Sequence, residues 1–259
     1  MENNNPYVSI VIPTYNEAVR KDKMKAHLES IVQYFKNKSL SYEVLIALDG
    51  PTDDTPQLAS EYASQLEGVR VLNRKENKGK GFTLREAMME AKGEIVLFTD
   101  MDGATPIKML DKFLPKFKDE NYDIVIGSRD MQESEVKVHQ PIWKEFLGNG
   151  GNLLIQMVGG LWGMKDTQCG FKAFTKEATA DIIPRTTVNR WGLDFELLMI
   201  GKKLGYKIVE VPVEWIDSGD STVGISGYIS TFKDLFSVKF NMLRGIYQLD
   251  KKVEELQKK

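Results

Sequence analysis

Short runs of apolar residues alternate with helical patterns over the first half of the chain. The runs lie at residues 8–12, 42–48, 69–72, 95–98 and 124–129. Apolar residues that follow one another without alternation are typical of parallel strands covered on both faces. Strands separated by helices in this way indicate a parallel sheet with right-handed crossovers. We therefore predict an α/β fold, with helices on both faces of a mixed, mainly parallel central sheet.

The regular alternation breaks after residue 130. The pattern then predicts a polar loop at 131–139, one or two helices at 143–164, a short strand pair or turn at 165–174, a helix beginning within 190–198, a strand at 207–213 and an amphipathic helix at 228–247. Residues 217–226 are rich in Gly and Ser and predict a loop, either one that closes over a ligand or a plain surface loop. Residues 251–259 are rich in Lys and Glu and predict a solvated tail.

Composition limits the classes of function. Hydrophobic residues make up 42% of the 259 residues, enough for the core of one large α/β domain or one domain with an appended subdomain. The formal net charge of −2 provides no basic field, so we expect no nucleic-acid partner. The single cysteine, Cys169, allows no intramolecular disulfide and fits a reducing compartment. Two histidines exclude a His-rich zinc site. The first six residues lack the pattern of a signal peptide, and no apolar run reaches the length of a transmembrane helix.

Polar turns follow three of the predicted strands, at residues 15–17, 49–54 and 100–102. In a parallel sheet such turns meet at one edge, beyond the carboxyl ends of the strands, where ligands bind. The carboxylates of Asp100 and Asp102 suit a hard cation such as Mg²⁺ or Mn²⁺. One Asp-x-Asp pair is also what a helix-capping loop contains, but three such turns together predict a nucleotide pocket.

The motifs at residues 8–17, 48–55, 77–81, 99–105 and 127–129, in this order, resemble those of the inverting family 2 glycosyltransferases. Residues 165–174, 190–198 and 214–215 make the chain similar to the dolichyl-phosphate β-glucosyltransferase, or polyprenyl-phosphate glycosyltransferase, branch. The resemblance implies a GT-A (Rossmann-like) fold, a nucleotide-diphosphate sugar as donor and Mg²⁺ or Mn²⁺ as cofactor.

The resemblance also implies roles for individual residues. The implied donor-binding residues are Pro13, Tyr15, Glu17, Asp49, Lys80, Asp100, Met101 and Asp102, of which Asp100 and Asp102 would hold the metal. Leu48 and Pro51 depart from the family's Asp-Asp-Gly-Ser turn. The implied acceptor-phosphate residues are Arg129, Lys144, Lys172 and Arg190. The candidate catalytic residues are Asp102, Arg129, Asp194 and Glu196.

The chemistry of the acceptor decides which of these residues are needed. A sugar hydroxyl must lose a proton to a carboxylate general base. A lipid monophosphate is already ionised at neutral pH, since its second pKa is about 6, and it requires cations more than a base. Asp194 and Glu196 are therefore a general base, or carboxylates that orient acceptor-binding cations, or a pair of charges at a helix N-terminus, where the dipole favours anions.

The sequence predicts transfer of a hexose, with glucose from UDP-glucose favoured, to polyprenyl phosphate with inversion. Residues 1–130 would bind the donor, residues 131–248 would bind the acceptor, and residues 249–259 are the charged tail. A membrane surface is favoured for segment 143–164, with subdomain core or a dimer face as the alternatives, and core packing is favoured over lipid contact for 228–247. We expect a cytoplasmic enzyme, peripheral on the cytoplasmic face of a membrane. Three alternatives stay open: a family 2 enzyme with a glycan or protein hydroxyl acceptor, a sugar nucleotidyltransferase, and a non-catalytic nucleotide-sugar-binding module.

Overall fold

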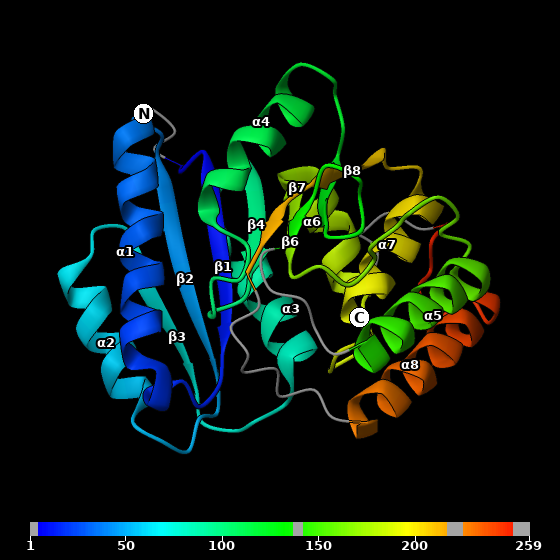
Figure 1. The fold of residues 1–259 in the computed structure, drawn as a ribbon, viewed down its shortest axis with the longest axis horizontal. Helices are drawn as coiled ribbons and strands as arrows, with labels where there is room; N and C mark the ends of the chain where they lie inside the picture. Colours follow the sequence, from blue (N-terminus) through cyan, green and yellow to red (C-terminus); the bar gives the residue numbers. More distant parts are fainter. Residues whose placement is uncertain (1–4, 137–141, 217–224, 251–259) are drawn as a thin grey trace.

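The computed structural model describes residues 5–136, 142–216 and 225–250, and a seven-stranded sheet lies at their centre (Figure 1). The strand order is β3-β2-β1-β4-β7-β5-β8. The strands are β1 (Val8–Thr14), β2 (Tyr42–Asp49), β3 (Val69–Arg74), β4 (Ile95–Thr99), β5 (Ile124–Ser128), β7 (Phe171–Thr175) and β8 (Ile208–Pro212). A separate short pair joins β6 (Glu135–Val136) to β9 (Glu214–Trp215).

Strand β7 is antiparallel to both of its neighbours, β4 and β5, while the other pairs of the central sheet are parallel. The sheet is therefore mixed and mainly parallel, as predicted. Because β7 runs in the opposite direction, the loop that precedes it lies at the edge where β4 and β5 end. This reversal brings the segment before Phe171 next to the turn that follows β4.

Helices cover both faces of the sheet (Figure 1). They are α1 (Lys21–Lys38), α2 (Thr55–Gln65), α3 (Lys80–Glu90), α4 (Leu110–Lys118), α5 (Ile142–Gly159), α6 (Lys176–Ile182), α7 (Leu193–Leu204) and α8 (Ile225–Leu243). Two apolar cores result. One lies between the sheet and the side of α1 and α4, and the other between the sheet and the side of α3, α6 and α7. Strand residues such as Leu97 and Phe98 are fully buried in opposite cores, which explains why the strands lack polar alternation.

Helices α5 and α8 lie side by side at one end of the molecule (Figure 1). A Cβ added at Gly151 of α5 would be 3.8 Å from the ring of Phe232 in α8, which shows how closely the two helices approach. Helix α8 buries Leu235 and Val238, so the predicted core packing of this segment is confirmed for one of its faces.

The first half of the chain folds as its pattern predicts, and the second half differs in detail. Segment 165–174 provides a central strand instead of a strand pair, and helix α6 was not predicted. The C-terminal helix ends at Leu243, and a turn follows it. The predicted loop at 217–226 and the tail at 251–259 lie wholly or mostly outside the described residues, as does part of the loop at 131–139.

Candidate active site

The loops that follow β1 and β2 form one wall of the site at the carboxyl edge of the sheet. The backbone N–H of Glu17 donates to Thr55 Oγ1 at 2.7 Å, and the N–H of Ala18 donates to Asp53 Oδ2 at 3.0 Å. Burial raises the pKa of Glu17, although its ion pair with Arg20 opposes the shift. These bonds fix the two loops to each other before any ligand binds.

Asp49 anchors the glycine turn at 77–81. Its buried carboxylate accepts bonds from the N–H groups of Lys78 and Gly79 at 2.9 Å each and from Thr83 Oγ1 at 2.9 Å. Gly79 has a φ of +99°, a conformation that L side chains rarely adopt. The structure thus shows Asp49, predicted to bind the nucleotide base, holding the turn from which α3 begins.

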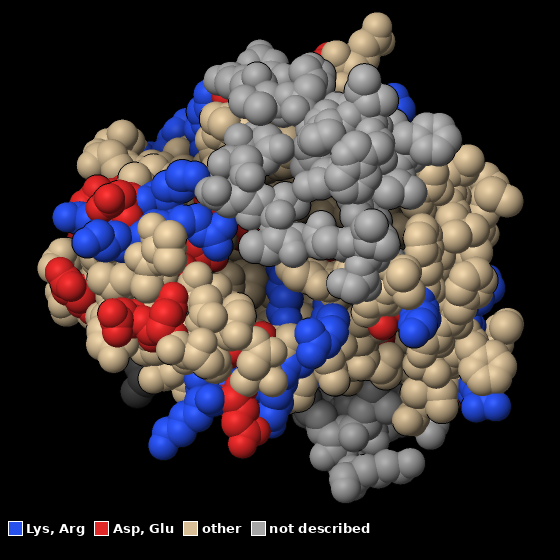
Figure 2. Space-filling view, turned by 60° about the horizontal axis from the view of Figure 1, so that its bottom comes forward, with Lys and Arg blue, Asp and Glu red and all other residues tan. Residues whose placement is uncertain are grey.

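Lys80, Asp100 and Asp102 form the charged centre of the site. Lys80 Nζ donates to Asp100 Oδ1 at 2.6 Å. Burial alone would lower the pKa of Lys80, but Asp100, Asp194 and Asp102 together raise it above its usual value. Burial and the nearby Asp100 carboxylate raise the pKa of Asp102. Figure 2 turns this edge of the molecule forward and shows Lys and Arg side chains beside a hollow, with acidic side chains among them.

Two close packings fix the turn that carries these carboxylates. A methyl group at Gly170, in the loop before β7, would overlap Asp100 Oδ2, and one at Gly103 would lie 2.8 Å from the imidazole of His27. His27 is buried beneath the turn, and burial lowers its pKa to about 4, although Asp100 opposes the shift. A neutral imidazole therefore supports the turn. Neither contact follows from the spacing of the sequence.

Lys172 and Asp194 form a buried ion pair. Lys172 is fully buried in β7, and its Nζ donates to Asp194 Oδ1 and to the carbonyl oxygen of Cys169. Asp194 lies in the first turn of α7, with its side chain 10% exposed. The burial of Lys172 does not fit the predicted contact with an acceptor phosphate. In this structure it neutralises Asp194 and holds the loop before β7.

Arg129 is fixed by Asp166, which sequence reasoning did not single out. The guanidinium donates to Asp166 from Nε at 2.6 Å and from Nη2 at 3.0 Å, and it lies 5.5 Å from the ring centroid of Trp215. Burial alone would lower the pKa of Arg129, but the charge and hydrogen bonds of Asp166 raise it, and the pKa lies above its usual value. Arg129 thus keeps its charge, but Asp166 accepts bonds from the guanidinium group that was predicted to bind a phosphate.

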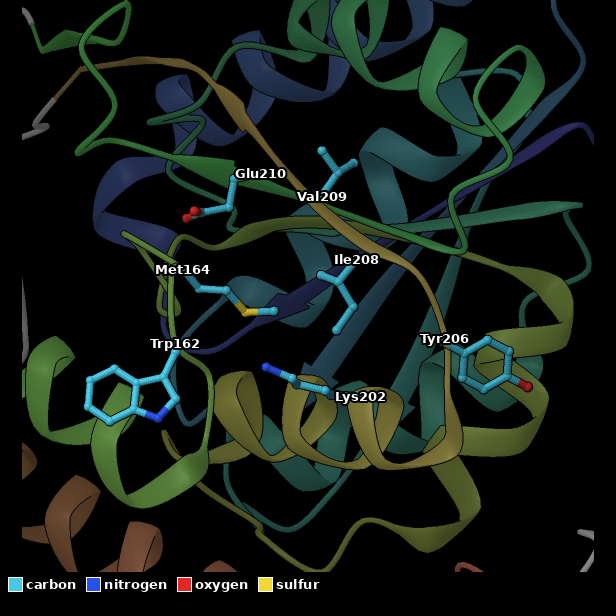
Figure 3. A pocket seen from close by; sticks show the side chains of 8 residues that line it. Trp162, Met164, Lys202, Tyr206, Ile208, Val209 and Glu210 are labelled. Carbon is cyan, nitrogen blue, oxygen red and sulfur yellow. The ribbon is translucent and has the colours of Figure 1, made fainter.

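A hollow of about 400 Å³ lies beside β8 (Figure 3). Lys202 and Glu210 line it, together with Trp162, Met164 and Tyr206. The carboxylate of Glu210 accepts bonds from the N–H groups of Lys165 and Asp166 at 2.8 and 2.9 Å. The hollow therefore lies outside the charged centre, but Glu210 in its wall supports the residue that fixes Arg129.

Glu196 is fully buried and bonded, so its structure does not fit the predicted role as a base. Its carboxylate accepts bonds from Thr187, Val188 and Tyr247. Glu196 does lie with Asp194 in the first turn of α7, as the alternative of a charge pair at a helix N-terminus predicted.

The remaining predicted residues have varied surroundings. Pro13 lies in β1 and Tyr15, 44% exposed, in the loop that follows it. The side chain of Met101 is buried in the core, so only its backbone lies in the acidic turn. Arg190 is exposed next to the glycine turn. Lys144 lies in α5.

The donor set at Asp100 and Asp102 fits a cation that also binds a ligand. Among the described residues, no group of three or more His, Cys, Asp or Glu side chains forms a cage for a metal. Two neighbouring, partly exposed carboxylates match the habit of Mg²⁺, which is bound by one or two carboxylates and completed by substrate phosphates.

A mainly parallel sheet with an acidic turn after β4 and a reversed strand beside it is the arrangement of the GT-A fold of glycosyltransferases. A structure of glucosyl-3-phosphoglycerate synthase from Mycobacterium tuberculosis, in complex with Mn²⁺, uridine diphosphate and glucosyl-3-phosphoglycerate, is similar in fold. It has a TM-score of 0.63 and 19% sequence identity, with 90% of this chain and 80% of that one covered. The family model for glycosyl transferase family 2 matches residues 9–183. The chain belongs to this family and is a glycosyltransferase.

Relatives of known name cover almost the whole chain. A dolichyl-phosphate beta-glucosyltransferase of Trichomonas vaginalis is 35% identical over 257 residues, which cover 96% of this chain and 75% of the relative. The dolichyl-phosphate beta-glucosyltransferase of Homo sapiens is 31% identical, with 94% of this chain and 78% of the relative covered. None of the helices in the described ranges combines the length and apolar content that crossing a membrane requires.

Proposed function

We propose that this enzyme transfers glucose from UDP-glucose to dolichyl phosphate or a similar polyprenyl phosphate, with inversion. The observation that carries the proposal is the Lys80–Asp100 pair beside Asp102 at the carboxyl edge of the sheet, in a chain 35% identical to a dolichyl-phosphate beta-glucosyltransferase. Residues 1–130 supply this donor side, and residues 131–248 supply the acceptor side.

The donor side is built to stabilise a leaving diphosphate. Breaking the anomeric bond leaves negative charge on the nucleotide diphosphate. Mg²⁺ or Mn²⁺ held by Asp100 and Asp102 would offset part of this charge. Lys80 is placed beside the same carboxylates, and it moves toward the diphosphate by exchanging its bond with Asp100 for one with a phosphate oxygen. Positive groups arranged in advance contribute most where charge develops.

The acceptor side must hold an ionised phosphate rather than remove a proton. Arg190 is exposed at the glycine turn, next to Lys80. Arg190, together with Lys144 of α5 and Arg129, would bind the acceptor phosphate, with Arg129 contributing charge from its fixed place beside Asp166. Lys172 is not included among these acceptor-phosphate residues, because it is buried against Asp194.

The acceptor also requires an apolar surface, and α5 and α8 offer one. Leu153 and Met157 of α5 are 52% and 55% exposed, and Phe236, Phe240 and Leu243 of α8 are 55%, 50% and 76% exposed. We define these five residues as the α5–α8 apolar surface. Side chains at i, i+4 and i+7 share one face of a helix, and apolar faces of this kind bind at membrane interfaces. We infer peripheral attachment to the cytoplasmic face of a membrane through this surface.

The membrane step is tested by co-sedimentation with liposomes that contain anionic lipid. The double variant Phe236→Ser and Leu243→Ser is expected to reduce the bound fraction severalfold. Val19→Ser is the matched control, because Val19 is 94% exposed but lies far from α8, after β1. Equal sedimentation of all three proteins would exclude this surface as the attachment site.

The reaction is tested with labelled UDP-glucose and, in parallel, GDP-mannose, each with a short-chain polyprenyl phosphate and Mn²⁺, with and without chelator. We expect an organic-extractable glucosyl product that disappears with chelator. A mannosyl product would change the donor only. Metal-dependent hydrolysis of UDP-glucose without lipid product would retain the donor side and reject the lipid acceptor.

A hydroxyl acceptor is the second candidate, and the position of Asp194 favours it. Asp194 is near enough to Lys80 to raise the pKa of that amine, so a carboxylate does face the charged centre. If it were a general base, Asp194→Asn would abolish transfer to a glycan and would remove the acid limb of the pH profile.

A further inference from the structure

Both carboxylate oxygens of Glu196 accept hydrogen bonds from other residues of the protein. Oε1 accepts bonds from the N–H of Thr187 at 2.8 Å, from Thr187 Oγ1 at 2.7 Å and from the Tyr247 hydroxyl at 2.8 Å. Oε2 accepts a bond from the N–H of Val188 at 3.0 Å. The side chain has no exposed surface. A group with these partners cannot reach a substrate, but it accepts bonds from the partly buried N–H of Thr187 and the buried N–H of Val188, which would otherwise be left unpaired.

The backbone that Glu196 holds belongs to residues 186–191, which we call the backing loop. The carbonyl oxygen of Asn189 accepts a bond from the N–H of Phe82 at 3.1 Å. Arg85 of α3 donates to Thr186 Oγ1 at 2.7 Å and to the carbonyl oxygen of Val188 at 2.8 Å. The backing loop therefore lies against the glycine turn and the first turn of α3.

Contact between the backing loop and the glycine turn leaves no space. A Cβ at Gly79 would overlap the carbonyl oxygen of Asn189, and one at Gly81 would lie 2.8 Å from that of Arg190. Lys80 lies between these two glycines, and its Nζ is 5.6 Å from the ring centroid of Trp191 in the backing loop. A shift of the backing loop therefore moves the residue that faces the donor diphosphate.

The tether at the other end is Tyr247, in the turn after α8. Tyr247 is 1% exposed, and burial followed by the charge of Glu196 raises its pKa above its usual value. Its carbonyl oxygen accepts a bond from Arg185 Nη1 at 3.0 Å, just before the backing loop. The C-terminal turn is thus bonded to Glu196 through the Tyr247 hydroxyl and to Arg185 through the Tyr247 carbonyl oxygen.

We propose that Glu196 is a positioning residue that holds Lys80 and Trp191 in place through the backing loop, with Tyr247 as its tether to the C-terminal turn. The effect on donor binding rests on the proposed function, in which Lys80 meets the diphosphate. The claim that Glu196 and Tyr247 hold the backing loop against the glycine turn does not rest on the proposed function, because it involves no ligand.

The first test compares Tyr247→Phe with Tyr34→Phe. Tyr34 is the matched control, since its hydroxyl also donates to a carboxylate, Asp111, at 2.9 Å, but at the opposite edge of the sheet, near the start of β1. In the ligand-free protein, hydrogen exchange of peptides covering 186–191 and 77–82 is expected to accelerate in Tyr247→Phe only. Calorimetric titration with UDP and Mn²⁺ is expected to show about three- to tenfold weaker binding in Tyr247→Phe only. This is a fraction of the free energy of one lost bond to a charged acceptor, because the bond acts on Lys80 only through the backing loop.

Each outcome decides the matter. Unchanged exchange in 186–191 and 77–82, with binding unchanged, would overturn the proposal. If the parent protein binds neither UDP nor GDP, the proposed donor fails, and the exchange data alone still decide whether Tyr247 and Glu196 fix the loop.

The second test separates positioning from base catalysis with Glu196→Gln. A positioning role predicts a donor KM raised about tenfold or more, with the acid limb of the kcat profile retained. Loss of kcat by more than about a hundredfold at unchanged KM, together with loss of that limb, would instead make Glu196 the base and overturn the proposal.

Discussion

Replacing Gly170 by Ala tests whether the position of the Asp100 carboxylate controls donor binding. The added methyl group would overlap Asp100 Oδ2. No left-handed backbone angle is required at Gly170, so the backbone accepts alanine. The cheapest relief is rotation of the Asp100 carboxylate, because it is the free end of a side chain that is 40% exposed. Rotation separates it from Lys80 Nζ, which now lies 2.6 Å away.

The magnitude follows from what the rotation removes. A hydrogen bond between charged groups contributes about 1.5–3 kcal/mol, and partial exposure of Asp100 places this one near the lower end. The fold loses little, because the pair lies at the edge of the sheet rather than in a core. Because Lys80 exchanges this bond for one with a phosphate oxygen when the donor binds, its loss does not itself weaken the complex. The metal–diphosphate complex would lose the placement of the Asp100 carboxylate as a metal ligand, a charged contact of similar size. We expect weakening by about 10- to 100-fold, which corresponds to about 1.4–2.7 kcal/mol.

The assay is calorimetric titration of UDP in the presence of Mn²⁺, with thermal melting of each variant in parallel. Gly150→Ala is the control, since a Cβ there meets nothing within 4 Å and Gly150 lies in α5, outside the turns that carry Lys80, Asp100 and Asp102. Gly170→Ala should melt within a few degrees of the parent but bind UDP with Mn²⁺ far more weakly. Parent-like binding in Gly170→Ala would refute the reasoning that Asp100 must hold this position.

Three further outcomes are expected. Lys80→Ala should lower kcat/KM by about 100-fold or more, because the positive charge at the diphosphate is lost. Lys78→Ala is the control and should change kcat/KM by less than about threefold, since the amine of Lys78 lies over the ring of Phe82 instead. Equal effects of the two substitutions would show that Lys80 does not act at the site. Burial lowers the pKa of His27 to about 4, so as pH falls the imidazole is protonated first in the unfolded chain. Chemical denaturation should therefore show that the free energy of unfolding decreases by about 3 kcal/mol between about pH 6.5 and 4, and His27→Gln should flatten this pH dependence. Burial raises the pKa of the Cys169 thiol to about 11, so a thiol reagent at pH 8 should modify it only on unfolding, and rapid labelling of the folded protein would show that the loop before β7 opens.

Much of the donor side could be predicted from the sequence because its signals are local. An apolar run followed by Asp100 and Asp102 specifies a buried parallel strand and a polar turn at its carboxyl end. The glycines at 79 and 81 likewise mark a turn before α3. These patterns depend on residues within about ten positions of one another, which is the range over which periodicity and turn chemistry act.

The acceptor side was less predictable because its partners are distant in sequence. Lys172, Arg129 and Glu196 carry charges suited to a site, and composition alone favours that reading. Each is instead bonded to a partner fixed by the sheet: Lys172 to Asp194, Arg129 to Asp166, and Glu196 to Tyr247, which lies 51 residues away. No spacing rule predicts such pairs, since each joins segments that only the folded chain brings together.

The reversed strand also explains how the two halves of the chain make one electrostatic unit. Because β7 starts at the carboxyl edge, Gly170 packs on Asp100, while two residues later Lys172 reaches inward to Asp194. Asp194 in turn raises the pKa of Lys80, which is bonded to Asp100. Positive and negative groups thus alternate from Lys172 through Asp194 and Lys80 to Asp100, across α7, β7, α3 and the turn after β4. An added phosphate would draw Lys80 away from Asp100 without leaving a buried charge alone, because Lys172 continues to neutralise Asp194. With Lys80 in its proposed role at the diphosphate, such an arrangement would let it change partners during the reaction while the rest of the network stays in place.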